Sequence, residues 1–125
     1  SSDDFIAMKD DVVRALKNVY KMTASDINQL VKEHTVYKND MDAYLNLIIM
    51  WFRDVLLYKA SNRKEALMFE AEWEIIEKQA REVSYEGVQE VLMEIDNLKG
   101  RLKSNVNFDI TLELLFIKIR EVLIK

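Results

Sequence analysis

Two apolar tracts dominate the hydrophobic pattern of the chain, residues 46–60 (NLIIMWFRDVLLYKA) and residues 108–124 (FDITLELLFIKIREVLI). In the first tract the apolar positions cover most of a helix circumference, whereas a surface helix would keep one charged face. We therefore expect a central helix that its neighbours enclose on nearly all sides. The second tract supplies the other main set of apolar side chains for a helical core.

Shorter amphipathic segments surround these tracts, with apolar residues that recur near the helical period. They predict helices over about residues 4–21, 26–34, 72–82 and 84–103, while Asn39 or Asp40 can cap the central helix, which extends to about Lys59. Proline is absent, so the strongest helix breaker is missing. The pattern predicts an all-α fold, a single compact bundle of about five to seven helices across residues 1–125.

Polar residues punctuate the predicted helices. Ser25, Ser84 and Asn107 precede apolar periodic segments and are expected N-caps, with Asp109 complementing the positive end of the last helix dipole. Gly100 lies inside a helical pattern, where glycine costs up to about 1 kcal/mol relative to alanine. It predicts either fraying or the close approach of a neighbour.

Composition limits the classes of function. The 125 residues fit one domain, and the absence of cysteine excludes disulfides, thiolate metal sites and a cysteine nucleophile, which favours an intracellular, cytoplasmic protein. The net charge of −4 is spread along the chain and argues against a nucleic-acid-binding patch. Charged residues interrupt every apolar run before the roughly 20 residues of a membrane span, so no membrane contact is expected. The opening SSDDF lacks an initiator methionine and suggests a piece of a longer protein.

Candidate chemistry is sparse. The two isolated glycines fit neither a Walker loop nor a dinucleotide loop. His34 lies near a predicted helix end and is expected at the surface. The glutamates at 70, 72, 74 and 77 are better explained as a solvated helix face than as acid–base catalysts. Lys78 is expected to pair with Glu74, four residues before it. The aromatic residues at 51, 52, 58 and 73 favour core packing over base stacking. We expect no cofactor, no metal and no enzymatic activity in this piece.

Arg53 and Asp54 are the unusual pair, because they interrupt the most apolar tract. Adjacent helical residues point about 100° apart, so each charge needs its own partner or its own route to solvent. In one interpretation both emerge along a narrow exposed stripe with Asn46. In the other, one of them pairs across an interface or with Glu113 or Arg120 of the last helix.

Two motifs carry a family resemblance. Residues 51–59 (WFRDVLLYK), and Asn105-Val106-Asn107-Phe108 leading into residues 112–115 (LELL), resemble the C-terminal domain of bacterial clamp-loader subunits of DNA polymerase III. The nearest resemblance is to the delta-prime subunit, with gamma/tau as the alternative, and it extends from about residue 39 to 123. Phe108 departs from the proline that often follows the second asparagine, and residues 61–85 match no pattern of the family.

The resemblance implies a helical collar domain that holds a ring of clamp-loader subunits together, while upstream AAA+ domains bind nucleotide and act on the sliding clamp and DNA. The implied partners are the delta and gamma/tau subunits. The resemblance further implies roles for the motif residues: Trp51 and Leu57 belong to the core, Arg53, Asp54, Asn105 and Asn107 are polar fasteners, and Lys59 and Glu113 are further structural or interface candidates.

Two other classes of protein fit the residues. One is an unrelated helical protein that binds a partner peptide or forms a homodimer through an exposed apolar stripe. The other is a helical enzyme or ligand-binding bundle that uses the acidic group at residues 70–77. Self-association without affinity for clamp-loader subunits would favour the first, and uptake of a metal or ligand would favour the second.

Overall fold

A computed structural model describes residues 2–104 and 107–124, and within these ranges the chain is helical, with no strand. The α-helices are α1 (Ser2–Asn18), α2 (Ala24–His34), α3 (Met41–Ser61), α4 (Trp73–Glu82), α5 (Tyr85–Lys103) and α6 (Phe108–Leu123). Short 3-10 helices η1 (Val19–Lys21), η2 (Thr35–Asp40), η3 (Lys64–Ala66) and η4 (Glu70–Glu72) lie between them. The prediction of an all-α fold is confirmed.

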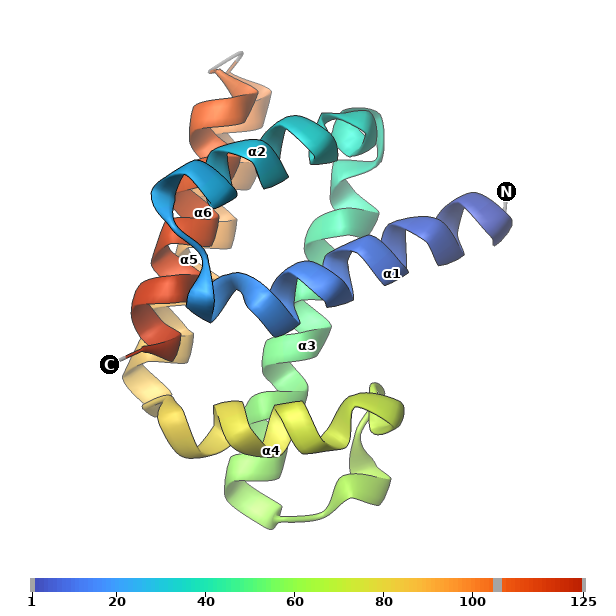
Figure 1. Ribbon diagram of the computed structural model, residues 1–125, viewed down its shortest axis with the longest axis vertical. Helices are drawn as coiled ribbons and strands as arrows, with labels where there is room; N and C mark the ends of the chain where they lie inside the picture. The colour runs from blue at the N-terminus through green and yellow to red at the C-terminus, as the bar shows by residue number, and fades with distance from the viewer. Residues whose placement is uncertain (1, 105–106, 125) are drawn as a thin grey trace.

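The helices form a framework of uprights and crossing elements. Figure 1 shows α3 and the α5–α6 pair running lengthwise, while α2, α1 and α4 cross between them at successive levels. Helix α5 packs on α6, α4 and α1 pack on α3, and α2 and η1 pack on α6. Segments from the two ends of the chain thus share one core, since α6 is held by α2 and η1.

Side-chain caps begin three of the helices. Thr23 and Asp26 form a reciprocal capping box at the start of α2, so the expected cap at Ser25 is wrong by two residues. Ser84 caps α5 and Asn107 caps α6 as predicted, each accepting a backbone N–H three residues on. The expected side-chain cap of α3 at Asn39 or Asp40 is wrong, because η2 leads directly into α3 and Asp40 makes no capping hydrogen bond.

Helix α3 is the enclosed central element that its pattern predicted. Between residues 43 and 59 its exposed side chains are those of Asn46 and Arg53, which lie seven residues apart on one stripe. Its fully buried aromatic residues, Tyr44, Trp51 and Phe52, pack in the same core as Phe116 of α6. Enclosure on nearly every side explains why the helix has a low charge content.

The two glycines differ in their surroundings. A Cβ atom on Gly87 would lie 2.9 Å from Val122 Cγ1, so the close approach occurs here, between the start of α5 and the end of α6. A Cβ atom on Gly100 would meet nothing within 4 Å. Gly100 lies within helix α5, so the close approach considered for it is wrong.

Candidate interaction surface

Asp54 is a fully buried carboxylate on α3. Its Oδ2 accepts the backbone N–H of Phe69 at 2.8 Å, and its Oδ1 accepts that of Met68 at 3.2 Å. Both donors belong to the segment between η3 and η4, which lacks helical hydrogen bonds of its own at this point. The carboxylate therefore fastens this segment to the central helix.

Arg53 reaches solvent, with 58% of its side chain exposed, and its Nη1 lies 3.7 Å from Asp54 Oδ1. The stripe with Asn46 is thus the correct interpretation for Arg53. For Asp54 both interpretations are wrong, since it is buried and accepts hydrogen bonds from backbone amides of its own chain, with Arg53 as a neighbouring cation. The sequence shows which charged side chains could pair with Asp54, but it does not show which loop folds back onto α3. The backbone N–H donors to Asp54 could therefore not be predicted.

A second buried polar connection joins three helices. Trp51 Nε1 donates to Gln79 Oε1 at 2.8 Å, and Gln79 Nε2 donates to the backbone oxygen of Leu16 at 3.0 Å. Gln79 is 6% exposed, so the two hydrogen bonds satisfy an amide that would be costly to bury alone. Sequence reasoning placed Trp51 in the core but missed Gln79, which has an ordinary polar position in the helical pattern of α4.

The remaining motif residues of α3 also serve the domain's own packing. Lys59 donates from Nζ to the backbone oxygen of Ala80, near the C-terminal end of α4, and lies over the ring of Tyr85. A cation at that end of α4 complements its dipole. Leu57 is half-buried against the core. The residues carrying the resemblance on α3 are therefore mainly internal contacts.

The motif at the start of α6 has two residues outside the described ranges, Asn105 and Val106. Asn107 Oδ1 accepts the N–H of Ile110 at 3.1 Å, and its backbone oxygen accepts the hydroxyl of Thr111. Glu113 is half-exposed and makes no hydrogen bond or ion pair within the described chain. Arg120, the other residue considered as a partner for the Arg53–Asp54 pair, donates instead to the backbone oxygen of Met22 at 3.0 Å.

His34 is buried at 4% exposure, so the prediction of a surface histidine is wrong. The chain turns back through η2 at this point, and the rings of Tyr37, Tyr44 and Phe116 all meet the imidazole edge-on. The Tyr44 hydroxyl contacts His34 Nδ1, and Tyr37 donates to Asp11 of α1. A surface position was expected from the dipole at the end of α2 alone, whereas packing by η2, α3 and α6 buries the His34 side chain.

This burial shifts the ionisation of the cluster. Loss of hydration lowers the pKa of His34 and raises that of Tyr44. Burial and the hydrogen bond to Asp11 raise the pKa of Tyr37 to about 12, and the same hydrogen bond lowers the pKa of Asp11. At neutral pH Tyr44 therefore stays protonated and His34 stays neutral, so the hydroxyl–imidazole contact is a hydrogen bond between uncharged groups. The cluster is a structural joint between α1, α2, α3 and α6.

A groove between α1 and α2 has a volume of about 690 Å³, and His34 lies on its wall. Its charged lining is mixed: Asp11 pairs with Arg14 at 3.0 Å, and Asp26 is engaged in the cap of α2. No nucleophile–base arrangement results. The groove offers no chemistry beyond ordinary surface contacts.

The acidic group at residues 70–77 does not form one helical face, because residues 70–72 belong to η4 and α4 begins at Trp73. Glu72 binds Lys17 at 2.9 Å, and Glu77 accepts the hydroxyl of Tyr58 at 2.8 Å. Lys78 lies over the ring of Tyr20 at 5.0 Å, so its expected pairing with Glu74 is wrong. Glu72 and Glu77 thus connect neighbouring elements of the fold.

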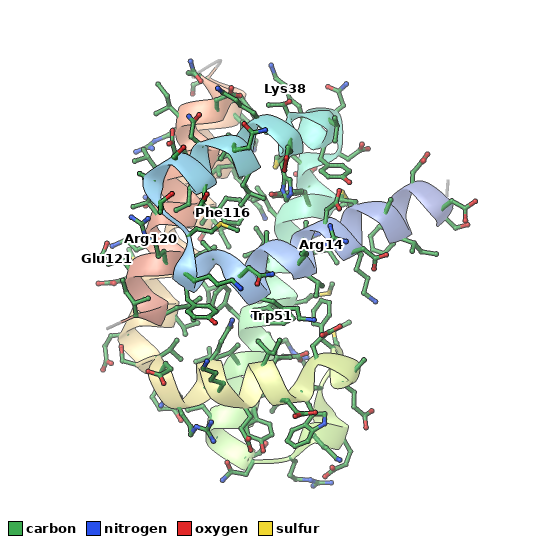
Figure 2. All side chains as sticks on the ribbon, viewed as in Figure 1. Arg14, Lys38, Trp51, Phe116, Arg120 and Glu121 are labelled. Carbon is green, nitrogen blue, oxygen red and sulfur yellow. The ribbon has the colours of Figure 1, made fainter. Side chains whose placement is uncertain are left out.

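Apolar side chains gather on the outer face of α6. Ile110 and Leu114 are 56% and 42% exposed, and Ile117 is partly buried. At about 100° per residue these positions fall within an arc of roughly 60°. Figure 2 shows Glu121, which belongs to the same arc, pointing away from the body, and Phe116 pointing into it. Helix α6 is therefore apolar on its inner and on its outer face.

Metal-binding groups and membrane-spanning helices are both missing from residues 2–104 and 107–124. No group of three or more acidic, histidine or cysteine side chains there is arranged to hold a metal ion. None of the helices in that part of the chain has the length and hydrophobicity needed to cross a membrane.

Comparison with known proteins identifies the family. The family model described as "DNA polymerase III, delta subunit, C terminal" matches residues 4–121. No curated protein and no solved structure matches the chain. The match confirms the resemblance to clamp-loader C-terminal domains, but the narrower prediction of delta-prime is not confirmed, because the family named is delta. The chain belongs to the family formed by the C-terminal domains of DNA polymerase III delta subunits.

Proposed function

We propose that this chain is the collar domain of a delta subunit of the DNA polymerase III clamp loader, and that it joins the subunit to its sister subunits by helix–helix packing. The family match over residues 4–121 carries this proposal. Delta is favoured over delta-prime and gamma/tau because the matching family is that of delta. The proposal places the protein in the cytoplasm, where bacterial replication takes place.

The distribution of polar contacts supports an assembly role. Asp54, Gln79 and Lys59 use their hydrogen-bonding groups for contacts within the domain. The outer face of α6 offers apolar surface without a reactive group. A rigid helical body with an uncovered apolar helix face suits binding to another protein better than catalysis.

The test is size-exclusion chromatography with light scattering. The 125-residue chain is mixed with the C-terminal domains of delta-prime and gamma/tau from the same organism. We expect a defined hetero-assembly, with the chain monomeric or weakly associated when alone. Failure to bind either domain at low and moderate salt would contradict the proposal.

A competition experiment separates delta from delta-prime. If the chain is a delta domain, the authentic delta C-terminal domain displaces it from the assembly, and the delta-prime domain does not. If it is a delta-prime domain, the displacement is reversed. Concentration-dependent self-association without any hetero-assembly would instead favour an unrelated dimerisation module.

We also propose that the domain does not hydrolyse ATP, since nucleotide binding would belong to AAA+ domains elsewhere in the subunit. Those AAA+ domains would also make the contacts with the sliding clamp and DNA. The measurement is release of phosphate by the purified chain. Turnover that survives repurification and is abolished by a point substitution in this chain would overturn the assembly role.

A further inference from the structure

Helix α6 is apolar around most of its circumference, which is typical of a helix that is covered on all sides. Its inner face is covered: Leu112, Leu115 and Ile119 are fully buried against the core. Helices α5 and α2 flank it, as Figure 1 shows for the α5 side, and both contact it. The outer face, with Ile110, Leu114 and Ile117, has no neighbour of this kind among residues 2–104 and 107–124.

The spacing of the outer residues indicates the shape of a partner that could cover them. Ile110, Leu114 and Ile117 follow the offsets i, i+4 and i+7, and Glu121 follows at i+11, which together form a seam nearly parallel to the helix axis. At 1.5 Å per residue the seam is about 16 Å long. A seam of this kind fits the apolar stripe of one helix lying along α6.

The charges beside the seam indicate which charged residues the partner helix would carry. Lys118 is engaged with Glu90 and Glu121, at 3.9 and 3.8 Å, and Arg120 is engaged with the backbone oxygen of Met22. Asp109 and Glu113 make no ion pair within the described chain. The charge left over along the seam is therefore negative, and Lys or Arg on the covering helix would complement it.

A second copy of this chain fits less well. In a parallel pair of α6 helices, Glu121 would face the same residue of the other copy across the seam. In an antiparallel pair centred on Ile117, Glu121 would lie level with Glu113 of the other copy. Both arrangements bring carboxylates together without adding a positive charge, and like charges in contact are unfavourable.

We propose that the outer face of α6 is the surface on which a helix of a sister clamp-loader subunit docks, with apolar residues at i, i+3, i+4 and i+7 of that helix and Lys or Arg beside them. This inference rests on the proposed function. It names the surface and the chemistry of the partner helix, which the family match does not give.

The test compares two double variants of the 125-residue chain in binding to the C-terminal domains of gamma/tau and delta-prime. Ile110→Ser with Leu114→Ser alters the seam. Val36→Ser with Met93→Ser is the matched control, because those side chains are 73% and 59% exposed and lie on η2 and α5. All four positions are exposed, so both variants are expected to fold.

We expect the seam variant to weaken binding by about tenfold or more, as loss of central apolar anchors does, and the control to bind like the wild type. Glu113→Gln should weaken binding a few fold at low salt, with the difference shrinking at high salt, because the contact is electrostatic.

Each outcome distinguishes the inference from the function. If the wild type and the seam variant bind equally well, the α6 surface is wrong and the assembly function stands. If the wild type binds neither sister domain, the proposed function fails, and the inference fails with it. If the wild type forms a homodimer that the seam substitutions disrupt, the occupant is a second copy, and the sister-subunit helix is refuted.

Discussion

Replacing Asp54 with alanine is expected to be among the most destabilising single substitutions in this domain, although it removes only one carboxylate. The side chain is fully buried and accepts two backbone hydrogen bonds, from Met68 and from Phe69. Without the carboxylate, both N–H groups lose their partner in a segment that has no helical hydrogen bonds there. The substitution therefore acts on the attachment of residues 62–72 to α3.

The magnitude follows from the two hydrogen bonds. Hydrogen bonds to a charged group contribute about 1.5–3 kcal/mol each, and entry of water recovers part of that. We expect Asp54→Ala to lower the free energy of unfolding by about 3–5 kcal/mol, as loss of one partner of a buried charge does. Asp54→Asn keeps one acceptor oxygen and turns an amide group toward the other N–H, so its expected cost is about 2–3 kcal/mol.

Arg53→Ala is the matched control, since Arg53 is the sequence neighbour of Asp54 but is 58% exposed. The guanidinium lies mostly in water at 3.7 Å from Oδ1, and Asp54 keeps both backbone donors without it, so this variant should stay within about 1 kcal/mol of the wild type. The assay is urea unfolding followed by tryptophan fluorescence. Hydrogen exchange at the Met68 and Phe69 amides then separates local detachment of the segment from global unfolding.

The reasoning is refuted if Asp54→Ala costs less than about 1 kcal/mol. It is also refuted if Arg53→Ala costs as much as Asp54→Ala, because the pair would then act through its charges and not through the backbone amides. Unchanged exchange at Met68 and Phe69 in Asp54→Ala would point to the same conclusion.

Three further predictions concern the core and the helices. Gly87→Ala should destabilise by about 1–3 kcal/mol through overpacking, while Gly100→Ala should stabilise by up to about 1 kcal/mol, and equal signs in thermal unfolding would contradict this. Trp51→Ala should cost about 3–5 kcal/mol in urea unfolding because it leaves a cavity and an unpaired Gln79 oxygen, and a change below about 1 kcal/mol would refute its burial. Because the folded state lowers the pKa of His34 below 6.5, the unfolded chain takes up its proton first, so stability should fall as pH decreases from about 6.5 and level off once folded His34 is protonated. His34→Gln should lack this component when its pH dependence is compared with that of the wild type.

The helices could be predicted because their signals are local. The apolar period, the missing proline and the caps at Ser84 and Asn107 each act within a few residues of the chain. Even the miss at Ser25 is local, because Thr23 with Asp26 satisfies one more N–H group than a single cap does. Errors of this size shift a helix end without changing the fold.

The polar joints could not be predicted, because their partners are far apart in the sequence. Gln79 meets Leu16, which is 63 residues away, and Asp54 meets the backbone of a segment that showed no helical pattern. His34 meets Phe116 only after α6 has packed on α2. Backbone acceptors and donors carry no residue-specific signal, so a single sequence cannot indicate which of them a buried polar side chain will find.

The two apolar tracts had similar patterns but have different surroundings, and this difference concerns function. Between residues 43 and 59, helix α3 is enclosed by its own chain except at Asn46 and Arg53. Helix α6 keeps Ile110 and Leu114 exposed. For α3, the cost of exposing apolar surface is avoided by folding alone. For α6 the same cost of roughly 25 cal/mol per Å² remains in the isolated domain and would be removed when a partner helix covers the face. The sequence pattern indicates that both helices need cover, and among residues 2–104 and 107–124 the fold covers α3 but leaves this face of α6 exposed.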